Sequence, residues 1–463
     1  HDREPIAVDR ITSLYCPSAE QTRVPTDSAD EGSDTADRDG SSSADHPSNG
    51  DRVEPSDRET DIERPRRSTR LVLAVGILAG LSGLVTRAFI SPDQYMLASD
   101  VYYHAAESML EGGDIYEVAP PDRPGFHYIY PPVVIFVFVP HVLTGGPAGA
   151  YLLQTALNLC FATGIAAVLW RAITRRGVSL ARPDAGLLFG FALLSTYSGI
   201  SVVNGQVNIG LALAIAVGLD ALDRNRGDIA GIAFALAALV KVFPAVLGLW
   251  LLRRRASRGV ALALAVGVTG LLVGLLALGP DVTETYLTDV LTGRYDGFDG
   301  APEPTQTRGG AQRQVAALLG IGPPYVTPLA ALALAPVLGY LYLDVETDRQ
   351  RLATALGTIL LTLLFLPLQR LYMVLFVFPL VVLLYTLPAT RSRTALLGAT
   401  LVSFSRVEFS IVEATLTTLP LDGLETPLVA LAERLFEVVL PTTLGMWLVL
   451  GACVLIHYDA RRC

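Results

Sequence analysis

The sequence is short of charge, cysteine and lysine, and each shortage excludes something. Only 17% of the 463 residues are charged, against 51% that are hydrophobic, a balance unlike that of an ordinary soluble domain. The four cysteines, Cys16, Cys160, Cys453 and Cys463, show no metal-ligand spacing. Neither a disulfide framework nor a cysteine-based metal site is therefore expected.

Lysine is nearly absent. One lysine, Lys241, stands among 35 basic residues, and the rest are arginine. Together with an acidic first segment, this favours a haloarchaeal source, because a strongly hydrated acidic surface keeps proteins soluble in high salt. A high-GC genome, which also favours arginine codons, is the alternative.

The first 70 residues differ from the rest of the chain. They carry 17 acidic and 10 basic residues, many Ser, Thr, Asp and Gly, and almost no apolar periodicity. Such a composition buries too little apolar surface to offset chain entropy. It also shows no signal-peptide pattern. Residues 1–69 are thus predicted to be a disordered acidic tail on the cytoplasmic side.

Beyond the tail, apolar runs of 15–25 residues recur, as expected for helices that cross a bilayer core about 30 Å thick. Residues 70–459 are predicted to be an all-α polytopic membrane domain with about 10–12 spans. Two apolar stretches, 131–144 and 228–252, are interrupted by proline or lysine, and parity makes them re-entrant or split helices. The alternative is that both are true spans, which requires some arginine loops to lie on the external side. Ten simple spans are predicted at 71–90, 150–170, 184–201, 207–222, 259–279, 326–343, 352–366, 371–388, 394–404 and 438–457.

The arginines set the expected topology. They cluster at 64–70, 171–182, 224–226, 253–258, 349–351, 391–393 and 461–462. The positive-inside rule places these clusters in the cytoplasm. Five polar or aromatic segments then lie on the external face, where the chemistry is expected: 91–130, 202–206, 280–325, 367–370 and 405–437.

The segment 91–130 holds the first candidates. Asp100 follows the first span, and desolvation near an apolar boundary would raise its pKa toward that of a useful general base. His104 lies one helical turn later on the same face, beside Tyr102 and Tyr103. The competing readings are a helix N-cap for Asp100 and a satisfied interfacial histidine for His104.

Three further places could bind a polar substrate. Asn204, Gln206 and Asn208 form the amide-rich turn VVNGQVN, suited to sugar hydroxyls or simply a polar turn. Lys241 in AALVKVFPAVLG would meet an anion such as phosphate, or its side chain would snorkel to the headgroups. Arg370 in FLPLQRLYMVLF could grip a phosphate bidentately, or anchor to lipid headgroups.

These motifs, in this order, resemble those of glycosyltransferase family 87, the polyprenol-phosphate-mannose-dependent mannosyltransferases of the GT-C superfamily. The resemblance covers about residues 70–260. It rests on an Asp and aromatics after the first span, Gly112-Gly113, the Tyr-Pro-Pro that begins at Tyr130, Asn-Gly-Gln-Val-Asn, and Lys-x-x-Pro before an arginine cluster.

The resemblance implies a GT-C-type bundle with Asp100 as catalytic base. It implies an inverting, metal-independent transfer of a hexose, mannose by family expectation, with no cofactor. The donor would be a polyprenyl- or dolichyl-phosphate sugar and the acceptor an envelope glycolipid or glycan, on the external face of the cell membrane. Substrate-binding roles are expected for Tyr102, Tyr103, His104, Tyr130, Asn204, Gln206, Asn208, Lys241 and Arg370. Membrane lipid is a partner and nucleic acid is not.

The chain departs from the family where members often carry Ser-x-x-x-His near the outer end of a late span. The comparable place reads Pro-Leu-Gln-Arg370-Leu-Tyr, so Arg370, His104 or His127 would have to assist. Two alternatives stay open, a transporter or flippase of a lipid-linked or small polar substrate, and a catalytically degenerate assembly subunit. A transporter should show internal repeats, and none is evident between the halves.

Overall fold

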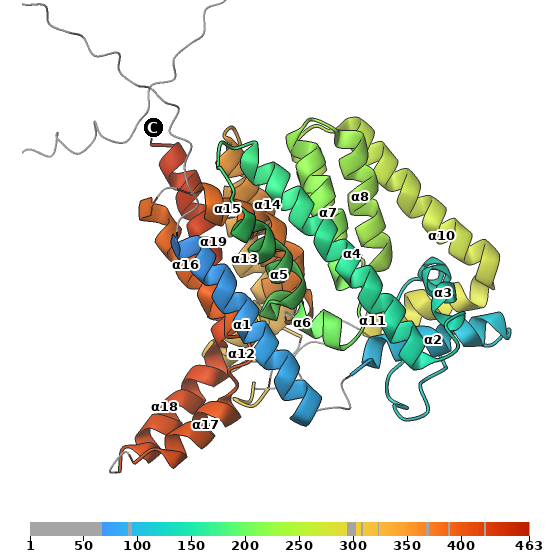
Figure 1. Cartoon of the computed structure of the whole chain (residues 1–463), viewed down its shortest axis with the longest axis horizontal. Coiled ribbons are helices and arrows are strands. Elements are labelled where there is room, and N and C mark those ends of the chain that lie inside the picture. Colours follow the sequence, from blue (N-terminus) through green and yellow to red (C-terminus); the bar gives the residue numbers. More distant parts are fainter. Residues whose placement is uncertain are drawn as a thin grey trace, which may run out of the picture. The chain divides into compact units, whose positions relative to one another are not determined.

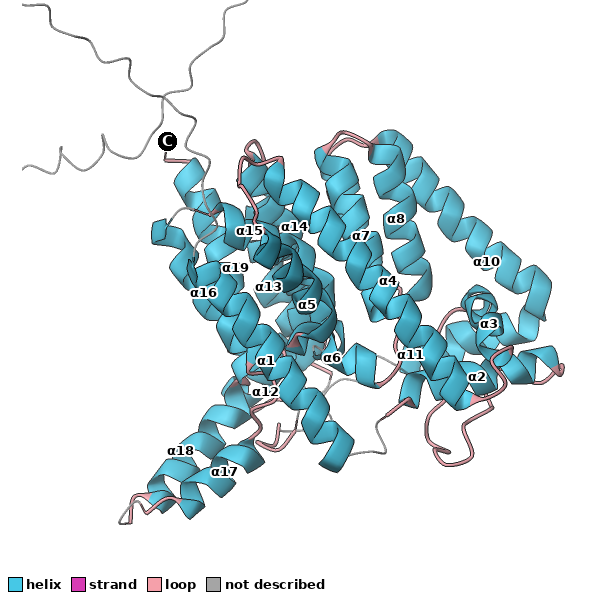
Figure 2. Cartoon of the chain, viewed as in Figure 1, coloured by secondary structure: helices cyan, strands magenta, loops and turns pink. Residues whose placement is uncertain are grey.

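The structure is a computed structural model that describes residues 67–90, 95–293, 302–306, 309–322, 324–366, 370–387, 389–420 and 423–462. The chain divides into two units, and all of these residues belong to the unit Ile62–Arg462. Residues 1–66 of the predicted acidic tail lie outside the described part. Every regular element in that part is a helix, and none is a strand (Figure 2), which confirms the all-α class.

Five described helices are long and apolar enough to cross a membrane: α1 (Arg67–Ile90), α4 (Pro147–Thr174), α10 (Ser257–Thr285), α13 (Val326–Leu343) and α19 (Pro441–Ala460). A sixth candidate is the pair α5 (Arg182–Leu194) and α6 (Thr196–Val203), which bends by 51°. Each of the six coincides with a predicted span, and the chain is a polytopic helical membrane protein.

The other four predicted spans are also helical: α7 (Asn208–Asp223), α14 (Asp348–Phe365), α15 (Val377–Thr386) and α16 (Ala389–Ser403). They are shorter, or carry charge in the first turn as α14 does with Asp348. Nearly every side chain of α14 and α15 is buried, so these helices form the centre of the bundle. The total of 10–12 spans stays a prediction.

The described helices pack in two groups. α1 contacts α5, α6 and α16, and α16 lies along α19. On the other side, α4 contacts α7, α7 contacts α8 (Gly227–Val240), and α8 contacts α10; α7, α8 and α10 follow one another from left to right in Figure 1. The hairpin of α17 (Phe409–Thr418) and α18 (Glu425–Val438) packs against α12 (Ala311–Leu319) through α18.

The stretch 228–252 is broken near its middle, as expected of the re-entrant or split helix that parity predicted. α8 ends at Lys241, and the chain turns through η4 (Phe243–Val246) into α9 (Leu247–Arg253). α8 and α10 run parallel, since Gly231 abuts Gly259 near their starts and Leu239 abuts Gly270 further along. A Cβ at Gly231 would lie 2.0 Å from the Gly259 carbonyl oxygen, so only glycine permits this approach. Because both helices start at the same end, α9 must lead back to that end.

The segment 131–144 also fails to cross in one piece. It forms a seven-residue 3-10 helix, η3 (Pro132–Phe138), followed by the single turn α3 (Val139–Val142). Both pack on α2 (Leu97–Leu110), and η3 also packs on α10. α10 continues past a kink at Gly279 into η5 (Tyr286–Val290) and α11 (Leu291–Gly293). Parts of the predicted external loop 280–325 (294–301, 307–308 and 323) lie outside the described residues.

Candidate active site

α2 presents Asp100 in its first turn and buries its opposite face. Ala98, Val101, Ala105 and Ala106 lie in the core, and the positive end of the helix dipole favours a carboxylate at this place. The N-cap is Met96, and no side chain caps the helix. The N-cap reading of Asp100 is therefore wrong, and its carboxylate is engaged elsewhere.

The Asp100 carboxylate lies between two basic groups. Arg123 Nη1 donates to Asp100 Oδ2 at 2.9 Å, and Arg123 Nη2 donates to the Tyr95 carbonyl at 2.9 Å. His104 Nε2 lies 3.4 Å from Asp100 Oδ1, while its Nδ1 lies 3.3 Å from a Glu107 oxygen. Burial raises the pKa of Asp100, and the charges of His104 and Arg123 oppose that rise without cancelling it.

A cluster of tyrosines adjoins this carboxylate. The hydroxyls of Tyr102 and Tyr130 share a 2.6 Å hydrogen bond, and Tyr116 donates to the Tyr130 carbonyl at 2.8 Å. Tyr102 also stacks on Phe138, with ring centroids 4.0 Å apart. Tyr103 points elsewhere and donates to Glu107 at 3.0 Å. The cluster thus fixes Tyr102 and Tyr130, but not Tyr103.

Lys241 occupies the break between α8 and η4, and only 4% of it is exposed. Its Nζ lies 4.6 Å from the Tyr130 ring centroid and 5.0 Å from that of Tyr372, and it donates to the Tyr372 hydroxyl at 3.3 Å. The snorkelling reading is therefore wrong, because the ammonium group lies among aromatic side chains inside the protein. Cation–π contacts of this kind stabilise a desolvated charge.

In the amide turn, Asn208 has a structural role, whereas the side-chain oxygen of Asn204 is unpaired within the described part of the chain. Asn208 is fully buried, and its Nδ2 donates to Gln206 Oε1 at 2.6 Å and to the Leu371 carbonyl at 2.9 Å. The Asn204 carbonyl accepts the Ala98 amide at 2.8 Å, which joins the turn to α2. Among the described residues, the buried Oδ1 of Asn204 has no hydrogen-bond partner.

These groups meet around a cavity of about 990 Å³, large enough for a sugar phosphate. Its polar lining includes Tyr102, Arg123, His127, Tyr130, Asn204, Gln206, Lys241 and Tyr372. Asp100 adjoins the cavity through its partner Arg123. Tyr103, His104 and Asn208 are not among the lining residues, and their predicted substrate contacts stay predictions.

Arg370 lies in a different place. It lines a second cavity of about 390 Å³ with Arg87, Arg406 and Glu408. Arg370 Nη1 donates to a Glu408 oxygen at 2.8 Å. The structure therefore does not bring Arg370 to the cavity of Lys241, although the next two residues, Leu371 and Tyr372, line that cavity.

Sequence reasoning missed Arg123, Arg87 and Arg406. Arg123 stands in PPDRPGF, a loop without periodicity, so nothing in the pattern ties it to Asp100. Arg87 stands near the end of the predicted first span, 71–90. Arg406 lies between two helices, in SFSRVEF. The available signal was the scarcity of arginine outside the predicted cytoplasmic clusters.

Comparison with known proteins gave one family and one curated relative. The model of glycosyltransferase family 87 matches residues 128–367, a range that includes Tyr130, Lys241 and the amide turn but begins after Asp100. The relative is the polyprenol-phosphate-mannose-dependent alpha-(1-2)-phosphatidylinositol pentamannoside mannosyltransferase of Mycolicibacterium smegmatis. It is 29% identical over 317 residues, which cover 65% of this chain and 70% of the relative. No solved structure matches the chain.

Proposed function

Because the chain belongs to glycosyltransferase family 87, we propose that this membrane glycosyltransferase transfers a hexose, specifically mannose, from a polyprenyl-phosphate-linked donor. The acceptor is an envelope glycolipid or glycan on the external face of the cell membrane. The relative's printed donor, polyprenol-phosphate-mannose, and its phosphatidylinositol-mannoside acceptor support both choices. The reaction is inverting and metal-independent, on a GT-C-type fold.

The observation that carries this proposal is the placement of Lys241. Its ammonium lines the same cavity as Arg123, the partner of Asp100. One cavity thus joins a cation suited to a leaving phosphate with the neighbour of a carboxylate suited to activating a hydroxyl. A polyprenyl-phosphate sugar needs both groups, one at each side of its anomeric carbon.

Asp100 acts as general base in this proposal. Arg123 occupies Oδ2, whereas the contact of Oδ1 with His104 is long at 3.4 Å. The acceptor hydroxyl therefore approaches Oδ1 and gives its proton to the carboxylate. Its oxygen forms a bond to the anomeric carbon, from the face opposite the phosphate.

The departing group is the polyprenyl phosphate. As the bond from the anomeric carbon to the phosphate oxygen breaks, its electron pair remains on that oxygen. Lys241, held by Tyr130 and Tyr372, stabilises the growing negative charge at a fixed position. Gln206 and the open Oδ1 of Asn204 offer hydrogen bonds to sugar hydroxyls. Arg370 lines the second cavity, so in this proposal it binds a phosphate of a lipid substrate there and does not contact the leaving phosphate.

The arginine distribution supports the orientation. The starts of α8 and α10 carry the clusters 224–226 and 253–258, and Lys241 and Asp100 lie toward the other end. The positive-inside rule then puts the N-terminus in the cytoplasm and the cavity toward the external face.

The test is sugar transfer by membranes that contain Asp100→Asn. We expect a loss of about 10²–10⁴-fold in transfer from polyprenyl-phosphate mannose to lipid or glycan acceptors, at unchanged protein level. Asp281→Asn, which changes an exposed carboxylate beyond the α10 kink, is the matched control and should retain full activity. Wild-type transfer by Asp100→Asn would contradict the proposed role of this residue.

A further inference from the structure

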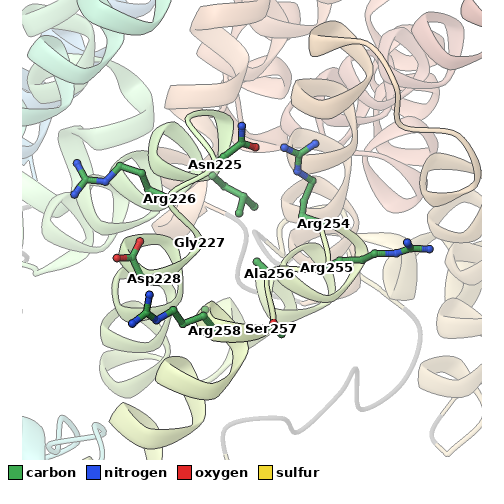
Figure 3. Close-up of a pocket in the computed structure, with 11 residues that line it drawn as sticks. Asn225, Arg226, Gly227, Asp228, Arg254, Arg255, Ala256, Ser257 and Arg258 are labelled. Atoms are coloured by element: carbon green, nitrogen blue, oxygen red, sulfur yellow. The ribbon is translucent and has the colours of Figure 1, made fainter.

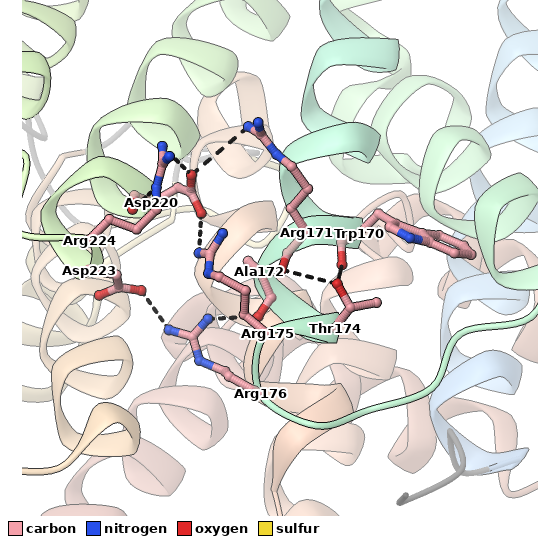
Figure 4. A network of polar contacts seen from close by, with 9 residues as sticks. All are labelled: Trp170, Arg171, Ala172, Thr174, Arg175, Arg176, Asp220, Asp223 and Arg224. Carbon is pink, nitrogen blue, oxygen red and sulfur yellow. Dashed lines mark hydrogen bonds and ion pairs between the residues drawn. The ribbon is translucent and has the colours of Figure 1, made fainter.

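The start of α8 and the start of α10 share an arginine-rich end of the bundle, and four arginines there have carboxylate partners. Asp220, 1% exposed on α7, receives three of them, with Arg224 Nη2 at 2.9 Å. Arg176 pairs with Asp223 at 2.5 Å. The complete network is Arg171, Arg175 and Arg224 around Asp220, and Arg176 on Asp223 (Figure 4).

Four neighbouring arginines do not share in this network. Arg226, Arg254, Arg255 and Arg258 line a cavity of about 500 Å³; in Figure 3 the side chains of Arg226 and Arg255 extend in opposite directions, and that of Arg258 extends toward Asp228. None of the four forms an ion pair or a side-chain hydrogen bond within the part of the chain that the structure describes. One carboxylate, Asp228, lines the cavity with the four arginines, and the charges of Asp223 and Asp348 act on Arg254 from outside it.

Two features of the cavity favour the binding of an anion. Burial and the nearby charge of Arg351 disfavour the charged form of Arg254 and lower its pKa, a cost that a bound anion would offset. The N-termini of α8 and α10 meet here, with Gly227 close against Ala256, so the positive ends of both helix dipoles point to one place. An anion is the group that would relieve this charge.

Two helix ends shape the backbone around the cavity. Asn225 and Arg255 line it with φ of 57° and 52°, and Met96 is the only other non-glycine residue with positive φ among those described. The left-handed conformation is unfavourable for a long side chain such as arginine. Both residues directly follow a helix end: the Arg226 amide donates to the Ala221 carbonyl at 2.9 Å and the Ala256 amide to the Leu251 carbonyl at 3.0 Å, the hydrogen bonds of a Schellman motif, so the helix ends account for this conformation.

We propose that this cavity binds a phosphate group, and that the phosphate bridges the two ends of the re-entrant hairpin 227–253. Guanidinium groups grip phosphate oxygens bidentately. Arg226 belongs to the hairpin's first end, and Arg254, Arg255 and Arg258 follow its second end. Lys241 stands at the hairpin's tip, so the bound phosphate supports the element that positions it.

An anionic phospholipid is the first source to test. α10, which begins at the cavity, is the most exposed of the candidate spans, with 11% of its apolar window buried. A lipid beside α10 therefore places its headgroup within reach of Arg258. Inorganic phosphate is the other source of the same chemistry. The site does not depend on which sugar the enzyme transfers.

The experiment measures thermal unfolding of the full chain in nanodiscs of phosphatidylcholine alone, with phosphatidylglycerol added, or with inorganic phosphate added. We expect phosphatidylglycerol to raise Tm for the wild type and for the control Arg182→Gln/Arg349→Gln, which removes two exposed charges outside the cavity. Arg226→Gln/Arg258→Gln should lose the rise. A rise with phosphate alone, lost in the same variant, also supports the site and assigns it to free phosphate. An equal rise in the cavity variant, or none in the wild type, overturns the proposal.

A second variant separates binding from folding. Arg255→Gly removes one charge from the cavity and relieves the left-handed backbone at 255. Its Tm without added anion should exceed that of the wild type, while the rise caused by the anion shrinks. If both the basal Tm and the anion-induced rise match those of the wild type, Arg255 has no part in anion binding and the proposal fails.

Discussion

Arg123 Nη1 lies 2.9 Å from Asp100 Oδ2, although 23 positions separate the two residues. The contact joins the loop before Tyr130 to the first turn of α2. It also gives the proposed base a fixed orientation, because Arg123 is itself held by the Tyr95 carbonyl at 2.9 Å. The Asp100 carboxylate is half-buried. Its Oδ2 accepts a hydrogen bond from Arg123, whereas its Oδ1 has only the longer 3.4 Å contact with His104.

This pair predicts a shift in the pH profile. Asp100 must be ionised to accept a proton, so the rate falls as the pH drops below its pKa. Burial raises the pKa of Asp100, and the charge of Arg123 counteracts that rise. Arg123→Gln removes the counteracting charge, and the acid limb of kcat/KM should therefore move to higher pH.

Arg123→Lys is the control for that profile, since it keeps the charge and should hold the acid limb near its wild-type position. The profile is measured as transfer from polyprenyl-phosphate mannose in membranes. A uniform loss of rate in Arg123→Gln, with the limb unmoved, would show that Arg123 does not tune the pKa of Asp100.

The separation of Lys241 from Arg370 predicts unequal effects on chemistry. Lys241 lines the main cavity, while Arg370 pairs with Glu408 in the second one. Lys241→Met should lower kcat by about 10²–10³-fold, as expected when one group that stabilises developing charge is removed. Arg370→Gln should lower kcat less. Single-turnover transfer at saturating donor measures both, and a larger loss in Arg370→Gln would reverse the assignment.

The sequence predicted what local spacing controls. Asp100 and His104 meet because residues four apart share a helix face, and Lys241 with Pro244 marks the break that makes 228–252 re-entrant. Contacts between residues far apart in the sequence, such as that of Arg123 with Asp100, could not be predicted from local spacing. Arg370 and Tyr372 are close in the sequence, but they stand in a 3-10 helix, η6 (Arg370–Phe376), where each residue rotates the side-chain direction by about a third of a circle. Arg370 therefore lines the second cavity, whereas Tyr372 lines the main cavity.

The amide turn should separate binding from stability. Gln206 lines the main cavity, whereas Asn208 is buried and donates to the Leu371 carbonyl. Gln206→Ala should raise KM for the donor with little change in Tm. Asn208→Ala leaves a buried carbonyl unsatisfied and should cost about 1–3 kcal/mol of stability, visible as a lower Tm in detergent. Equal KM effects with no difference in Tm would show that both amides contact substrate.

The last prediction concerns Arg313, the largest fully buried side chain among the described residues. It lies in α12, and its guanidinium donates to four backbone carbonyls: Glu303 at 2.6 Å, Gln306 at 3.1 Å, Phe436 at 2.6 Å and Glu437 at 2.9 Å. The first two belong to the loop before α12 and the last two to the end of α18. One side chain thus joins three segments of the chain.

Arg313→Met should loosen the α17–α18 hairpin. Each buried carbonyl left without a donor costs about 1–3 kcal/mol, and methionine fills much of the volume without replacing any of the bonds. We expect faster proteolysis and faster hydrogen exchange over 405–437, with slower exchange preserved in α14 and α15, whose burial does not depend on this contact. Arg434→Met, an exposed arginine on α18, is the control and should leave the hairpin protected. Equal protection in both variants would mean that apolar packing of Phe409 against Phe436, 6.0 Å between ring centroids, holds the hairpin without Arg313.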